Sequence, residues 1–143
     1  MKIKFKRLHK DAVIPKQSSE GAGGWDVVAT HITVTPSCAI CELGFAVEIP
    51  KGYKLTIVPR SSLTKTYWTI LNSPCLIDSD YRGQIMVVFR AIPDNNNYIP
   101  FPYKAGDRIA QCYLEEVIPM EFEEVDELED TVRNSGGFGS TGK

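Results

Sequence analysis

Apolar and polar residues alternate with a period of two along much of the chain. At residues 2–6, Ile3 and Phe5 fall between lysines, so both apolar side chains would lie on one face of an extended edge strand. β-Branched residues are frequent in similar stretches, which favours strands over helices. The pattern predicts strands at residues 2–6, 26–29, 32–34, 45–49, 53–58, 84–90 and 108–117.

Turn-forming residues separate these strands. Nine prolines and 11 glycines are spread along the chain and would break any long helix. Pro50 and Gly52 lie between two predicted strands and indicate a hairpin, and residues 93–97 form the clearest loop. One short helix is expected near residues 62–66. Many short strands with regular turns predict an all-β, jelly-roll-like sandwich or barrel with at most one short helix.

Length and charge fit one soluble domain. The chain has 143 residues, 43% of them hydrophobic, and a net charge of −2, so its overall charge favours neither nucleic acid nor acidic membranes as partners. No segment approaches the roughly 18 apolar residues of a membrane span. The alternating N-terminus lacks the apolar block of a signal peptide. We therefore expect a soluble, cytoplasmic protein that binds neither nucleic acid nor membrane.

The composition changes toward the C-terminus. Nine of the 18 acidic residues lie between Glu115 and Asp130, and the last 11 residues contain four glycines with little to bury. Such a tail is expected to become ordered only against another surface. We therefore expect one β domain at residues 1–130 and a flexible, glycine-rich arm at residues 131–143.

Cys38 and Cys41 form an isolated C-x-x-C pair. A structural zinc site needs four ligands, and no second pair of cysteines or histidines follows. We interpret the cysteines as free thiols, with a zinc or redox site as the less favoured alternative.

The C-terminal tail carries groups suited to a nucleotide. Its glycines let backbone N–H groups approach phosphate oxygens, Ser140 and Thr141 add hydroxyl donors, and Arg133 and Lys143 add positive charge. Phe138 is able to stack on a base. The segment superficially resembles a P-loop, but that motif needs a strand before it and a helix after it. Taken alone, the tail is better explained as a loose terminus.

Two internal segments add further candidates. Arg60, Ser61 and Ser62 follow a predicted strand, and a guanidinium with nearby hydroxyls matches phosphate oxygens. In the segment 76–83, Asp78 is able to activate a water or hold a metal, and Tyr81 is able to pack flat on a sugar. Each segment taken alone is also explained as a polar surface turn.

Two more segments complete the set. In the segment 106–111, Gln111 alternates with Ile109, so its amide would point into a cleft if Ile109 is buried. In the segment 22–27, small residues would allow close backbone packing around Asp26 at a strand start. Each is otherwise an ordinary turn beside a strand.

Together the five segments read AGGWDV, PRSSL, IDSDYRG, GDRIAQ and RNSGGFGSTG. In this order and spacing they resemble the five motifs of the trimeric dUTP diphosphatase (dUTPase) family, and the resemblance spans residues 22–142. It implies an all-β jelly roll in a homotrimer, with the C-terminal arm swapped over a neighbouring subunit. Three active sites would lie at subunit interfaces, each using motifs from three chains.

The same resemblance implies a reaction. Water would attack the α-phosphorus of dUTP to release dUMP and pyrophosphate, with Mg²⁺ on the triphosphate. This reaction would keep uracil out of DNA and supply dUMP for dTMP synthesis.

The resemblance assigns roles residue by residue. Asp78 matches the general base, and Gln111 matches a member of the phosphate and water network. Tyr81 matches the residue that packs on deoxyribose, and Asn72 matches a uracil-contacting residue. Asp26 matches the acid that organises the water shell of the metal.

The remaining matches concern the triphosphate and the arm. The predicted triphosphate contacts are Arg60, Ser61, Ser62, Arg133, Ser140 and Thr141, of which Arg133 counts among the catalytic residues. Phe138 would stack over the uracil when the arm closes. Three positions depart from the family pattern: Trp25 replaces a common Tyr, and Cys75 and Asn134 replace common glycines.

Two other functions are compatible with this scaffold. A dCTP deaminase needs a Glu in the hairpin before the third motif, but residues 66–77 contain no acid. A non-catalytic nucleotide sensor would tolerate loss of Asp78, Tyr81 or Arg133, but all three are present. Whether a regulatory protein also binds is left open by the sequence.

Overall fold

The computed structural model describes residues 1–92, 99–138 and 140. Within these residues the regular structure consists of short strands and one 3₁₀ helix, which confirms the all-β prediction and the expectation of at most one short helix. The elements are β1 (Lys4–Arg7), β2 (Trp25–Val28), β3 (His31–Val34), β4 (Ala39–Glu42), β5 (Phe45–Glu48), β6 (Tyr53–Val58), η1 (Ser61–Lys65), β7 (Trp68–Ile70), β8 (Cys75–Ile77), β9 (Met86–Ala91) and β10 (Arg108–Glu116).

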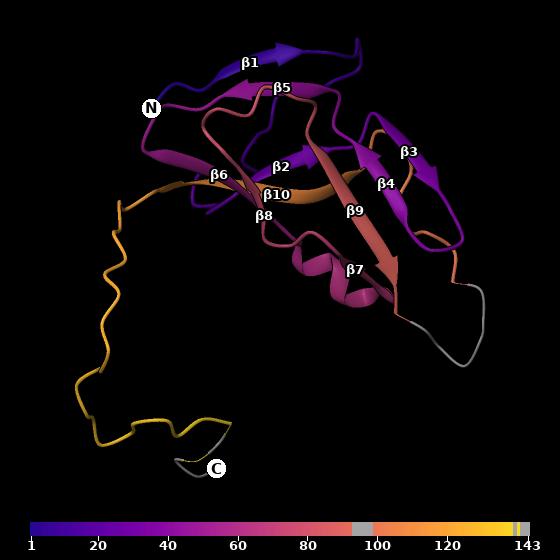
Figure 1. The fold of residues 1–143 in the computed structure, drawn as a ribbon. Helices are drawn as coiled ribbons and strands as arrows, with labels where there is room; N and C mark the ends of the chain where they lie inside the picture. The colour runs from indigo at the N-terminus through magenta and orange to yellow at the C-terminus, as the bar shows by residue number, and fades with distance from the viewer. Residues whose placement is uncertain (93–98, 139, 141–143) are drawn as a thin grey trace.

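The strands form three antiparallel sheets around one core (Figure 1). One sheet has the order β2-β10-β6-β8, the second has the order β3-β4-β9-β7, and β1 pairs with β5 in the third. Side chains from all three sheets meet in the interior, among them the fully buried Val27, Phe45, Ile57 and Phe89. The alternating sequence pattern thus buries one face of each sheet.

The turn at residues 50–52 exists, but the predicted hairpin around it is wrong. The Tyr53 N–H donates to the Pro50 carbonyl at 3.1 Å, and Gly52 has the left-handed φ of +85°. However, β5 pairs with β1, whereas β6 pairs with β10 and β8. The chain therefore crosses between sheets at this turn, because pairing partners are chosen by tertiary packing and a turn signal carries no information about them.

Three strands were not predicted. These are β4, β7 and β8, each three or four residues long. The outward-facing position of β7 is Thr69, and the inward-facing Trp68 and Ile70 are buried. Alternation over three residues cannot be distinguished from chance, so these strands exist because neighbouring strands supply their hydrogen-bond partners.

The chain leaves the β domain after β10. The Val117 N–H donates to the Gly52 carbonyl at 2.8 Å, and the following segment runs away from the sheets (Figure 1, orange to yellow). Ile118, Met120 and Phe122 are 78%, 80% and 87% exposed, so their apolar side chains contribute nothing to this core. In the described part of the chain, no helix is long and apolar enough to cross a membrane.

Candidate active site

Two arginines from distant parts of the sequence converge on Asp26. Arg60 Nε lies 2.9 Å from Asp26 Oδ1, and Arg108 Nη1 lies 2.9 Å from Asp26 Oδ2. The Ser18 hydroxyl donates to Oδ2 at 2.5 Å and lies 3.0 Å from Arg108 Nη1. Two guanidiniums face one carboxylate, so the cluster carries net positive charge and suits a polyanionic ligand.

The ionisation of Asp26 reflects these contacts. Its side chain is only 12% exposed, and burial alone would raise its pKa. The Ser18 hydroxyl and the Arg60 and Arg108 guanidiniums outweigh burial and hold the pKa of Asp26 below its ordinary value. Asp26 is therefore a carboxylate at neutral pH and keeps both arginines in place.

A β-bulge brings Arg108 into this cluster. In the pairing of β10 with β2, Arg108 lies opposite Val28 and Gln111 lies opposite Asp26, with a shift of register between Arg108 and Ala110. In a regular strand, residues three apart point to opposite faces. The extra residue places Arg108 and Gln111 on the same face as Asp26, which is how bulges re-aim side chains.

Gln111 joins the first, second and fourth motifs. Its Nε2 donates to the Pro59 carbonyl at 3.1 Å, immediately before Arg60. A Cβ on Gly24 would lie 3.1 Å from Gln111 Oε1, so the glycine makes room for the amide. Ser61 and Ser62 follow Arg60 at the start of η1 and are exposed. Residues of these three motifs therefore lie together within one chain.

Asp78 lies at the opposite end of β6. Ile77 pairs with Leu55, so the exposed Asp78 follows beside Lys54 rather than beside Arg60. It borders an open hollow of about 890 Å³ that Lys51, Lys54 and Arg82 also line. Glu48 and Asp80 line the same hollow, so its charge is mixed. The exposed carboxylate of Asp78 is free to accept a hydrogen bond from a water.

Tyr81 is held in a turn close to Asp78. The Tyr81 N–H donates to the Asp78 carbonyl at 3.2 Å, and its hydroxyl donates to the Gln84 carbonyl at 3.0 Å. A Cβ on Gly83 would overlap the Tyr81 phenol, so the ring lies directly over the Gly83 backbone. The side chain remains 41% exposed, which leaves part of the ring free for a flat ligand.

Asn72 lies at the end of β7, near β8 and β9. Its Oδ1 accepts from the Val88 N–H at 3.1 Å. The side chain therefore ties the loop before the third motif to β9. Cys75 pairs with Ile57 and Ile77 pairs with Leu55, so Asn72 lies toward the Arg60 end of β6 and Asp78 lies toward the other end.

The fifth motif lies outside the domain. Arg133 Nε donates to the Gly136 carbonyl at 2.8 Å, and Phe138 and Ser140 are exposed. The predicted contact Thr141 lies outside the described residues. One copy of the chain therefore presents the predicted site residues in separate places: the Asp26 cluster and Asn72 toward one end of β6, Asp78 and Tyr81 toward the other end, and the arm outside the domain.

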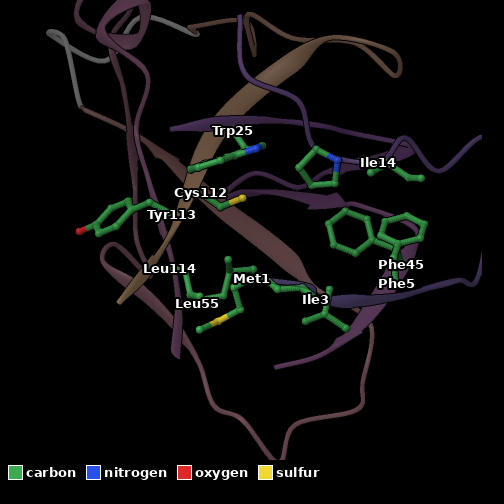
Figure 2. A pocket seen from close by; sticks show the side chains of 12 residues that line it. Met1, Ile3, Phe5, Ile14, Trp25, Phe45, Leu55, Cys112, Tyr113 and Leu114 are labelled. Atoms are coloured by element: carbon green, nitrogen blue, oxygen red, sulfur yellow. The ribbon is translucent and has the colours of Figure 1, made fainter. Parts of the chain in front are cut away.

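A second cavity has a different character. It encloses about 340 Å³ between β1, β5, β6 and β10, and its lining is mostly apolar (Figure 2). None of the predicted site residues lines it. Since it lacks the polar groups that would bind a phosphate, this cavity suits an apolar segment of chain rather than a nucleotide.

Comparison with known proteins decides the family. The model of the dUTPase family matches residues 10–142, which is nearly the whole chain. The chain belongs to the dUTPase family.

Relatives of similar length support this membership. The deoxyuridine 5'-triphosphate nucleotidohydrolase of Helicobacter pylori (strain P12) is 39% identical over 145 residues, covering 99% of this chain and 97% of that protein. The protein of the same name from Picosynechococcus sp. is 42% identical and covers 99% of each. Family membership thus rests on the full length of both chains.

Solved structures of the dUTPase family show the same fold. A single-site variant of the Staphylococcus bacteriophage 80alpha dUTPase with dUpNHpp superimposes with a TM-score of 0.82 at 23% identity, covering 99% of both chains. A variant of the phage phi11 dUTPase from S. aureus, described as revealing the coordination of a structural Mg(II) ion, gives a TM-score of 0.74 at 21% identity and covers 91% of this chain.

Arg108 and Ser18 belong to the cluster but were not predicted from the sequence as site residues. Arg108 was visible in the GDRIAQ segment, but regular alternation would have set it on the face opposite to Gln111. Ser18 lies eight residues before Asp26 in a loop and carried no signal at all. Both became visible only with the bulge and the folded loop.

The departures from the dUTPase pattern cause no backbone conflict. Among the described residues other than glycine, only Asn134 and Phe138 have positive φ, at +41° and +50°. Asn134 therefore adopts the left-handed region that Asn tolerates well. Cys75 begins β8 as a regular strand residue, so glycine is not needed at this position.

The cysteines are free thiols in the structure. Burial raises the pKa of Cys41 and Cys112 to about 12, which opposes the thiolate form that metal binding and disulfide exchange require. Within the described ranges, no three His, Cys, Asp or Glu side chains are grouped to hold a metal.

Proposed function

We propose that this chain hydrolyses dUTP to dUMP and pyrophosphate by attack of water on the α-phosphorus. Membership of the dUTPase family supports the reaction. The observation that carries the proposal is the Asp26 cluster, in which Arg60, Arg108 and Gln111 form a preorganised anion site from three of the five motifs. Preorganised donors stabilise the charge that develops on a phosphoryl group in the transition state.

Asp78 acts as the general base in this proposal. Its carboxylate is exposed beside an open hollow, where it is able to orient the attacking water and accept its proton. Tyr81 packs on the deoxyribose and leaves no room for a 2′-hydroxyl, which selects dUTP over UTP. Asn72 belongs to the hairpin that reads the uracil.

The triphosphate is held from two directions. Arg60, Ser61 and Ser62 bind it from the domain, and Gln111 completes the network of phosphate and water. Arg133, Ser140 and Thr141 bind the terminal phosphate from the arm. Phe138, also in the arm, stacks on the uracil. Closure of the arm excludes water other than the nucleophile.

Mg²⁺ fits this site through water rather than by direct ligation. Asp26 Oδ1 is ion-paired with Arg60, and Oδ2 accepts hydrogen bonds from Arg108 and Ser18. Mg²⁺ keeps several waters and binds phosphate oxygens readily. Asp26 would therefore orient the waters of the metal, and the bound metal would neutralise charge on the triphosphate.

The active site is shared between subunits of a homotrimer in this proposal. Asp78 and Arg60 belong to opposite ends of the six-residue strand β6, and at about 3.3 Å per residue they are separated by roughly 20 Å within one chain. A water activated at Asp78 cannot reach a phosphate held at Arg60 of the same chain. An Asp78 from one subunit and an Arg60 from another would meet across an interface.

The segment after β10 supports assembly. Ile118, Met120 and Phe122 are exposed and alternate with residues that include Glu121. This is the pattern of a half-buried strand, yet in the described structure it lies against no sheet. We propose that residues 1–130 form the domain and that the chain beyond it, including the arm at residues 131–143, extends over a neighbouring subunit.

The strand β1 offers a matching surface. Ile3 and Phe5 line the apolar cavity (Figure 2), and Lys4 and Lys6 lie on the other face of the strand. β1 pairs with β5 along one edge, and its second edge has no strand partner among the described residues. An acidic, alternating segment from a neighbouring copy complements both the apolar cavity and the basic face.

Product analysis tests the reaction. The chain is incubated with dUTP, dCTP, dTTP and UTP, with and without Mg²⁺. We expect pyrophosphate and dUMP from dUTP alone, faster with Mg²⁺. Ammonia release from dCTP, or binding of dUTP without hydrolysis, would overturn the proposal.

Mixed trimers test the shared site. Asp78→Asn and Arg60→Ala variants are each expected to be nearly inactive, but co-refolded subunits combine an intact Asp78 from one with an intact Arg60 from the other. In a random equal mixture, about a quarter of the sites would be intact if each draws these residues from different subunits. No recovery of activity in a mixture that forms mixed trimers would exclude sharing.

A further inference from the structure

Both polar atoms of the exposed Asn72 carboxamide have partners in their own chain. Its Oδ1 accepts from the Val88 N–H at 3.1 Å, and its Nδ2 lies 3.4 Å from the Met86 carbonyl and 3.3 Å from Cys75 Sγ. The Leu71 N–H donates to the Val88 carbonyl at 2.8 Å just before this point. The side chain of Asn72 therefore extends the pairing of β7 with β9 beyond the last residue of the strand.

The orientation of the amide follows from its partners. The Val88 N–H is a donor only, so the atom of Asn72 that faces it must be the oxygen. The amide nitrogen then points toward Met86 and Cys75. The sulfur of Cys75 is the side-chain acceptor in this arrangement, and a thiol sulfur accepts weakly.

Cys75 is placed to keep this contact. It begins β8 and pairs with Ile57 in β6, and its side chain is 9% exposed. Burial raises the pKa of the Cys75 thiol, so the group remains neutral and adds no charge to the hairpin. A glycine at this position, as is common in the family, would have no group to offer the Asn72 nitrogen.

We propose that Cys75 is a positioning residue for base recognition, acting through Asn72. By accepting from the Asn72 nitrogen, its sulfur keeps the amide in the orientation that ties residues 71–75 to β9. The backbone between these two residues is thereby held in the shape that reads the uracil edge. This role rests on the proposed dUTP hydrolysis, because the hairpin acts on the base only if a uracil nucleotide is the substrate.

Substitutions at Cys75 separate the hydrogen bond from packing. Cys75→Ala removes both, Cys75→Val keeps a strand-forming apolar side chain without an acceptor, and Cys75→Ser keeps an acceptor. Cys112→Ala is the matched control, since it deletes another buried thiol, on β10, which β6 separates from β8. Cys75→Val keeps the test usable if the alanine variant unfolds.

Kinetics on dUTP and dCTP give the first readout. In Cys75→Ala and Cys75→Val we expect KM for dUTP to rise by about threefold to tenfold, the scale of one modest hydrogen bond, with little change in kcat. The ratio of kcat/KM for dUTP to that for dCTP should fall by a similar factor. Cys75→Ser should remain close to the parent chain, and Cys112→Ala should leave KM unchanged.

Hydrogen exchange gives a readout that does not depend on activity. The Val88 amide donates to Asn72, so its exchange should accelerate by about threefold to tenfold in Cys75→Ala and Cys75→Val relative to Cys112→Ala. Unchanged Val88 exchange and KM in both variants would overturn the positioning role. If the parent chain fails to hydrolyse dUTP while Val88 exchange responds as expected, the proposed function fails and the contact between Cys75 and Asn72 stands.

Discussion

The two ends of strand β6 carry two parts of the candidate site, and they are built very differently. At the Arg60 end, ion pairs to Asp26 join residues of three motifs. The side chain of Asp26 is only 12% exposed, and each of its two arginine partners lies 2.9 Å away. At the other end, Asp78 is an exposed carboxylate beside an open hollow. The first part is complete before substrate arrives, and the second is open.

This difference matches the chemistry proposed for each end. Phosphate binding benefits from donors whose positions are fixed in advance, because no reorganisation is then needed in the transition state. A general base must instead reach a water and a substrate that arrive together. The arm is less preorganised still, since its residues make only local hydrogen bonds in the described structure.

Asp78→Asn should have the largest effect, and it should impair only the function of the open end. The amide keeps size and hydrogen bonding but loses basicity, so turnover should fall by about 10²- to 10⁴-fold while dUTP binding remains. Rapid-quench turnover and calorimetric binding of a non-hydrolysable dUTP analogue measure the two quantities. Near-normal turnover would remove Asp78 from the role of base.

Truncation before Arg133 should have the next largest effect. The arm lies outside the core, so the shortened chain should remain a folded trimer and lose roughly 100-fold in turnover, the scale of losing a preorganised donor. Sedimentation and thermal unfolding monitor assembly beside the assay. A trimer that melts at much lower temperature would show instead that the arm stabilises the fold.

Gly83→Ala should disturb the open end without touching the substrate directly. The added Cβ would overlap the Tyr81 phenol, so the ring must move. We expect discrimination between dUTP and UTP to fall by about tenfold, the scale of about 1.4 kcal/mol of lost sugar packing. Tyr81→Ala should give a comparable or larger loss, and unchanged selectivity in both variants would count against the sugar-packing role.

The smallest expected effect is on acid stability at the preorganised end. The pKa of Asp26 is held below its ordinary value, so its contribution to folding stability is fully present above about pH 4 and is lost as the pH falls through the folded-state pKa. Ser18→Ala removes one hydrogen bond to the carboxylate and should move acid unfolding to slightly higher pH. Urea unfolding between pH 3 and pH 7 measures this shift, and Ser61→Ala is the control.

Much of the fold could be predicted because alternation is a local property. The longer strands such as β6 and β10 were located from period-two patterns, and the 3₁₀ helix lies within one residue of its predicted position. The strands β4, β7 and β8 were missed because three or four residues hold too little pattern. The pairing of β5 with β1 rather than β6 was missed because partner choice depends on the whole core.

Part of the candidate site could likewise be predicted from the sequence, and part could not. The five motifs predicted individual roles for Asp78, Arg60 and Gln111. Those roles remain predictions. The bulge that turns Arg108 toward Asp26 could not be read from alternation, since a bulge is defined by the partner strand. Ser18 could not be found either, because only the folded loop brings it to the carboxylate.

The sequence by itself determined the chemistry available to this protein: which residues carry charge, which are candidates to bind phosphate, and which family the chain resembles. Those properties belong to side chains and to their order along the chain. Only the tertiary structure decided that Asp78 and Arg60 lie at opposite ends of one strand and that Asn72 is bound by Cys75. Register, bulges and buried contacts arise between segments far apart in sequence, so they exist only once the chain has folded.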